Sequence, residues 1–103
     1  MVRFILKQPK VFYTEHPIFY QILKSGKSIG ANVREAEHAE SIDDFKHKLK
    51  IALKEANESL YWLEILYHAE YIDSKSYESM KSECIELNKL LIAIINTINK
   101  KTN

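Results

Sequence analysis

Apolar side chains recur in alternating steps of three and four residues through three long segments of the chain. The first segment begins at Pro17, a residue suited to the first turn of a helix. Its seam positions are Ile22, Ser25, Ile29, Asn32, Ala36 and Ala39. Because this spacing puts the seam on one side of an α-helix, it predicts a helix over residues 17–40.

The second and third segments have longer and more regular seams. The second seam comprises Phe45, Leu49, Ala52, Ala56, Ser59, Leu63 and Leu66. The third comprises Tyr77, Met80, Cys84, Leu87, Leu91, Ile94 and Ile98. Ser41 is a good N-cap, and Asp43 and Asp44 suit the positive end of a helix dipole. We therefore predict helices over residues 41–70 and 75–100, and a repeat close to 3.5 favours antiparallel packing at about 20°.

The positions of glycine and proline support an all-helical fold. The chain of 103 residues has two Gly and two Pro, and all four occur at or before Gly30. A β-sandwich would need turn signals every ~8–12 residues. We predict one all-α domain over residues 1–103, an antiparallel up-and-down helical bundle with short connections. Pro9 interrupts the apolar positions near the start, so residues 1–16 are predicted to be irregular or a short helix, with two short strands as the alternative.

Charge and cysteine content narrow the class of protein further. The formal net charge is +1, with basic ends and an acidic middle, so total charge does not indicate a nucleic-acid binder. Cys84 is the single cysteine and cannot form an intramolecular disulfide. The longest apolar run, residues 90–95, is far shorter than the ~20 residues of a membrane-spanning helix. These observations predict a cytoplasmic protein without a membrane anchor.

Two blocks of sequence carry a family resemblance. They are SGKSIGANVREA at residues 25–36 and DFKHKLKIALKEANE at residues 44–58, followed by YWL at residues 61–63. The chain resembles the bacterial four-helix bundle family of 23S ribosomal RNA intervening-sequence proteins. The first block is the more specific one, and its core reads Ser-Ile-x-Ala-Asn-x-x-Glu.

The resemblance implies a four-helix bundle that assembles as a ring-shaped homopentamer and has no catalytic residues. A related branch of the family serves reverse transcriptases as an accessory protein and binds nucleic acid. Members carry a full amphipathic first helix, whereas this chain has a shorter stretch before the motif. The resemblance therefore implies a bundle whose first element is shortened or irregular.

Polar residues on the first seam predict an inter-helix network. Ser25 and Asn32 occupy seam positions, and Glu35 follows Asn32 by three residues. Buried polar groups need partners, which we expect on the next helix at Lys48, Glu55 or Ser59. We interpret the set as a structural network that fixes helix register; a small polar ligand site is the alternative.

The sequence offers little for catalysis or metal binding. Glu35 and His38 have the Glu-x-x-His spacing of di-iron bundles, but such sites need two such pairs and two more carboxylates. Arg34 with His38 is a spacing common by chance on helices. Cys84 lies on an apolar seam and is expected to be a small core residue. We predict no catalytic site, no metal, no cofactor and no enzymatic activity.

A stripe of lysines is the candidate nucleic-acid contact. Lys46, Lys50 and Lys54 recur every four residues, so their ammonium groups span about 12 Å, comparable to a few phosphate spacings. The alternative is an ordinary solvated face neutralised by neighbouring acids. No aromatic residue is interleaved among the three lysines, so base stacking is not indicated.

The last predicted helix carries more apolar residues than one seam uses. Ile85, Ile92 and Ile95 lie outside the seam, and we predict that they form a homo-oligomer interface, either a pentamer or a dimer. Two functions remain open at this point. One is a non-enzymatic assembly module that contacts RNA, ribosomal RNA or a nucleic-acid-processing protein, and the other is a protein–protein interaction bundle without nucleic-acid binding.

Overall fold

The computed structural model describes residues 17–102, and these form three α-helices without a β-strand. They are α3 (Pro17–Glu37), α4 (Ile42–His68) and α5 (Ser74–Thr102). The prediction of an all-α fold and the three predicted helices are confirmed. The fourth element of the predicted four-helix bundle falls on residues 1–16, which lie outside the described residues.

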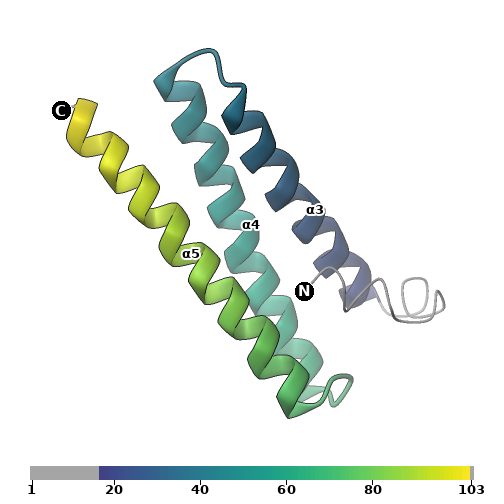
Figure 1. The fold of residues 1–103 in the computed structure, drawn as a ribbon. Coiled ribbons are helices and arrows are strands. Elements are labelled where there is room, and N and C mark those ends of the chain that lie inside the picture. The colour runs from purple at the N-terminus through teal and green to yellow at the C-terminus, as the bar shows by residue number, and fades with distance from the viewer. Residues whose placement is uncertain (1–16, 103) are drawn as a thin grey trace.

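The three helices run up, down and up, with α4 between the other two (Figure 1). The backbone of α4 lies within 8 Å of both neighbours, whereas no Cα atom of α3 comes that close to α5. The molecule is consequently long and flat, with extents of 47 × 22 × 16 Å.

The core consists of two clusters along this length. One surrounds the start of α3 and the α4–α5 connection, where the buried residues are Phe19, Ile22, Leu63, Leu66, Ile72, Tyr77, Met80 and Cys84. The other lies toward the end of α3, where the buried residues are Ile29, Ala36, Leu49, Ala52, Ala56, Leu91 and Ile95. The small alanines of α4 let its neighbours pack closely in this second cluster. Fully burying one of the larger aliphatic side chains contributes about 1.5–3 kcal/mol.

The α3–α4 connection begins earlier than the sequence predicted. The helix α3 ends at Glu37 rather than at residue 40. Two backbone hydrogen bonds of 3.1 Å close this end, from His38 N to Glu35 O and from Ala39 N to Ala36 O. Ser41 then caps α4 as predicted, because its Oγ accepts a 3.0 Å hydrogen bond from Asp44 N.

The α4–α5 connection is a tight turn closed by backbone hydrogen bonds. Tyr71 N donates to Leu66 O at 2.9 Å and Glu70 N donates to Tyr67 O at 3.0 Å, which is the Schellman pattern. Glu70 adopts φ 65°, the left-handed position where glycine is usual. The Tyr67 and Tyr77 rings stack with centroids 4.3 Å apart and join the end of α4 to the start of α5.

None of the helices in residues 17–102 is both long and apolar enough to cross a membrane.

Candidate nucleic-acid interface

Two of the three predicted lysines lie free on the surface of α4. Lys50 and Lys54 are exposed, one helical turn apart, and neither takes part in an ion pair with another described residue. They line a shallow hollow of about 560 Å³. Its other lining residues are Leu53, Asn57, Glu58 and Tyr61. Two neighbouring ammonium groups at one hollow form a local cationic site on a chain with little net charge.

The third lysine of the stripe has a structural role. Lys46 is half-buried and its Nζ donates a 3.1 Å hydrogen bond to Asn99 Oδ1 on α5. This bond joins the start of α4 to the end of α5. The structure therefore separates Lys46 from the two exposed lysines that the same spacing predicted with it.

An exposed aromatic ring borders the same hollow, which sequence reasoning missed. Tyr61 is 56% exposed and lies two turns beyond Lys54. No aromatic residue lies between the lysines in the sequence, but a residue seven positions after Lys54 shares their side of the helix. The seven-residue spacing from Lys54 to Tyr61 is the sequence signal that predicts this ring beside the lysines.

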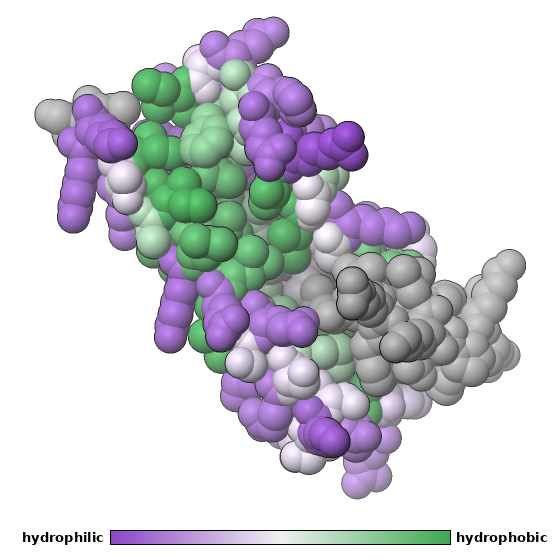
Figure 2. Space-filling model, viewed as in Figure 1, coloured by the Kyte–Doolittle hydropathy of each residue, from purple (hydrophilic) through white to green (hydrophobic). Residues whose placement is uncertain are grey.

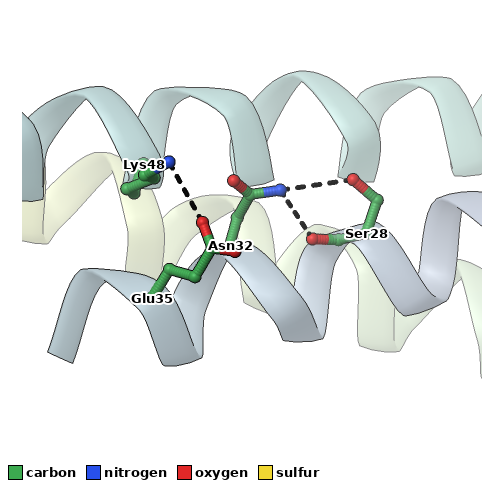
Figure 3. Close-up of polar contacts among 4 residues, drawn as sticks. All are labelled: Ser28, Asn32, Glu35 and Lys48. Atoms are coloured by element: carbon green, nitrogen blue, oxygen red, sulfur yellow. Dashed lines mark hydrogen bonds and ion pairs between the residues drawn. The ribbon is translucent and has the colours of Figure 1, made fainter. Parts of the chain in front are cut away.

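The predicted polar network takes a different form in the structure (Figure 3). Asn32 Nδ2 donates to Ser28 O at 2.8 Å and to Ser28 Oγ at 3.3 Å, so its partners lie on its own helix rather than on α4. The inter-helix contact is made by Glu35, whose Oε2 lies 3.0 Å from Lys48 Nζ. Ser25 is buried on the α3 seam, and Ser59 Oγ is buried without a hydrogen-bond partner among the described residues.

The chain, including the motif at residues 25–36, matches one known protein family. The chain matches the family model of the 23S rRNA-intervening sequence protein over residues 7–93. The chain belongs to this family. No curated protein matches it.

A crystal structure of another family member is similar over nearly the whole chain. It is a protein with unknown function from the S23 ribosomal protein family of Bacteroides thetaiotaomicron VPI-5482. The two are 51% identical, with a TM-score of 0.82, and the match covers 92% of this chain and 88% of that one. The resemblance inferred from residues 25–36 and 44–63 is thus confirmed.

The most specific 23S rRNA-intervening sequence motif serves helix packing in this chain. Of its core residues, Ile29 is buried between the helices, Asn32 bonds Ser28, and Glu35 pairs with Lys48. The pair raises the pKa of Lys48, chiefly through the hydrogen bond from its ammonium group to the Glu35 carboxylate. The burial of Ile29 and the Glu35–Lys48 pair position α3 against α4, whereas the bond between Asn32 and Ser28 lies within α3.

The remaining candidate chemical groups are those considered for metal binding and for nucleophilic catalysis. Within residues 17–102 no three His, Cys, Asp or Glu side chains are grouped so that they could hold a metal ion. Glu35 and His38 border a hollow of about 520 Å³ together with Arg34 and Lys48. Cys84 is buried, and desolvation raises the pKa of its thiol, which keeps it in the less nucleophilic protonated form.

The predicted oligomer residues are divided between core and surface. Ile95 is 7% exposed and packs inside the second core cluster, so its side chain contributes to the core of one chain. Ile85 is half-buried, and Ile92 is 44% exposed. Of the three, Ile92 alone presents a large part of its surface to solvent.

Proposed function

We propose that this chain is a non-enzymatic helical assembly module that acts in the cytoplasm and contacts RNA through the exposed side of α4. The observation that carries the proposal is the pair Lys50 and Lys54, exposed on adjacent turns and not neutralised by an ion pair among the described residues. The name of its family refers to ribosomal RNA, which supports RNA as the polyanion. The contact would be local, since the whole chain carries a net charge of only +1.

The test is a titration of fluorescently labelled single-stranded RNA at two salt concentrations. Phosphate contacts release counterions, so log affinity falls linearly with log salt, by about 0.7 per contact for single strands. The double variant Lys50→Glu with Lys54→Glu should weaken binding and make the salt slope shallower by about 1.4. Lys46 is left unchanged, because its bond to Asn99 holds two helices together.

A matched control separates a local contact from total charge. Lys24 and Lys27 are exposed on α3, and changing both to Glu alters the net charge by the same amount. This control should bind RNA as the parent chain does at moderate salt. Equal losses in both double variants would overturn a specific lysine contact, and salt-independent or absent RNA binding in the parent would overturn the proposal.

A second candidate function, self-association of an interaction bundle, is favoured by an apolar face. Apolar residues gather on the side of the molecule shown in Figure 2, toward the end of α5. Leu90, 58% exposed, lies one turn from both Leu87 and Ile94 on α5. A hollow of about 490 Å³ continues this surface over Phe45 and Ile98. Apolar surface of this kind is typical of an interface.

The charges at this hollow favour a second copy of the chain as the occupant. Glu37 and Glu40 line its α3 edge, and Lys101 lines its α5 edge. A two-fold axis parallel to the helices would place the α3 edge of one copy opposite the α5 edge of the other, at the same end. Acids and lysines would then face each other around an apolar centre.

Light scattering at micromolar concentration tests this association and gives the subunit number. We expect a mass above the 12.1 kDa of one chain, and Leu90→Glu should return it to that value without loss of helix. Asn96→Glu, a change at an exposed polar position of the same helix, is the control. A parent chain that scatters as a monomer would overturn self-association, whatever the result with RNA.

A further inference from the structure

Tyr61 lies between two hollows on the outer side of α4. The first is the lysine hollow already described, and the second, of about 440 Å³, is lined by Tyr61, Glu64, Ile65, His68 and Ala69. Lys50, Lys54, Tyr61 and His68 follow one another at spacings of four, seven and seven residues. Such steps keep all four on one side of the helix over about 27 Å.

The environment of Tyr61 differs from that of its neighbour. Trp62 is half-buried and packs against the first core cluster, whereas Tyr61 is not part of either cluster. The two rings meet edge to face with centroids 5.1 Å apart and planes at 60°. This contact orients the exposed ring, and an oriented, accessible ring beside cationic groups is the arrangement on which nucleic-acid bases stack.

We propose that α4 binds single-stranded RNA along the track formed by the four residues named above. The phosphates lie at Lys50 and Lys54, and an unpaired base stacks on Tyr61. This proposal rests on the RNA contact proposed above and names the ligand as a single strand. Stacking on a side chain requires a base that is not already paired within a duplex. The step of about 10 Å from Lys54 to Tyr61 along the helix is a distance that a few nucleotides span.

Two acidic residues beside the track restrict where the phosphates and the bases of the RNA can lie. Glu58 lines the lysine hollow on the side toward Tyr61, and Glu64 lines the second hollow. Carboxylates repel phosphates, so the RNA backbone is directed to the lysine end, while the uncharged face of a base is accepted at the ring. Asn57, between Lys54 and Tyr61, is already engaged, because its Oδ1 accepts a 2.8 Å hydrogen bond from Asn88 Nδ2.

The experiment compares single-stranded RNA of about ten nucleotides with a duplex of the same sequence, a length within the range of known single-strand sites. Tyr61→Leu should weaken single-strand binding about tenfold and leave duplex binding unchanged. Tyr61→Phe should keep the parent affinity, since stacking does not need the hydroxyl. Tyr20→Leu, at a tyrosine 53% exposed on α3, is the matched control and should have no effect.

Trp62 supplies an independent readout. It is the single tryptophan of the chain and touches the Tyr61 ring. Single-stranded RNA should change its emission in the parent chain, and Lys50→Glu with Lys54→Glu should shift that change to higher RNA concentration. Unchanged emission at saturating RNA would overturn the stacking.

The variants distinguish the two proposals. If the lysine double variant weakens binding while Tyr61→Leu binds single strands like the parent, base stacking is wrong and the RNA contact stands. If the parent prefers the duplex, the single-strand assignment is wrong. If the parent binds neither RNA in a salt-dependent way, both proposals fail.

Discussion

Lys48 Nζ lies 3.0 Å from Glu35 Oε2, so the last turn of α3 is joined to the second turn of α4 (Figure 3). Both side chains remain partly exposed, 28% for Lys48 and 58% for Glu35. Exposed pairs of this kind contribute little to stability because water and salt screen them. The contact nevertheless fixes which residues of the two helices face each other at this end of the molecule.

Glu35→Gln should lower the melting temperature slightly at low salt, and the difference should vanish near 1 M salt. The folded pKa of Lys48 is raised above 10.5 by its bond to Glu35. The contribution is therefore complete below the unfolded pKa and is lost as pH rises through the folded pKa. Glu37→Gln, at an exposed position of the same helix, is the control for thermal melts across salt and pH. A deficit that persists at high salt would show that the pair acts through packing.

Asn32→Asp should destabilise the chain by about 1–3 kcal/mol in urea denaturation. The amide Nδ2 of Asn32 donates to Ser28 O at 2.8 Å, and a carboxylate would place an acceptor against that carbonyl. Asn32→Leu should cost less, because it removes the donor without adding a charge. Asn96→Asp, on an exposed part of α5, controls for the added charge. Equal effects of the Asp and Leu changes at residue 32 would contradict this account.

Helix positions and most core residues could be predicted because heptad spacing is a local property of the sequence. On α4, every predicted seam residue from Leu49 to Leu66 is buried. On α5 the seam shifts: Ile95 is buried, whereas Leu87, Ile94 and Ile98 are half-buried. A straight helix drifts relative to a 3.5 repeat. The backbone of α5 lies within 8 Å of α4, whereas no Cα atom of α5 comes that close to α3. Which side of α5 is covered depends on this arrangement of three helices, which spacing does not encode.

The candidate site was predictable only in part for a related reason. Spacing placed Lys46, Lys50 and Lys54 on one side of a helix, but the partner of Lys46 is Asn99, 53 residues further along the chain. A contact between distant residues depends on how α4 and α5 align. Conversely, Asn32 was assigned a partner on the next helix, whereas Ser28, four residues earlier on its own helix, lies within reach.

Gly30→Ala should raise the free energy of unfolding by about 0.5–1 kcal/mol. The melting temperature should then be higher by a few degrees. Gly30 is exposed within α3, and a Cβ added there meets no atom within 4 Å. Ala31→Gly, the reverse change at the next exposed position, should lower stability by a similar amount. No gain from Gly30→Ala would indicate a contact made in an assembly.

Asp73 should make stability fall as pH drops below about 4. Its Oδ1 accepts a 2.6 Å hydrogen bond from Ser76 N at the start of α5, and this bond lowers the pKa of the carboxyl below 3.8. A depressed folded pKa gives stability that is present above the unfolded pKa and is lost as pH falls through the folded value. Asp73→Asn, which keeps an N-cap acceptor, should flatten this part of the curve. Asp43→Asn, at an exposed position, is the control in urea melts from pH 2.5 to 6.

Glu70→Gly should stabilise the chain by about 0.5–1 kcal/mol, because Glu70 holds φ 65° at the end of α4. A side chain with a Cβ is strained in this left-handed conformation, whereas glycine adopts it freely, and the gain exceeds the extra entropy that glycine has in the unfolded chain. Glu70→Ala is the decisive control. It removes the same carboxylate but keeps the Cβ, so its midpoint in urea should match that of the parent. If the alanine variant gains as much as the glycine variant, the charge of Glu70 at the negative end of the helix dipole, rather than its backbone conformation, is what destabilises this turn.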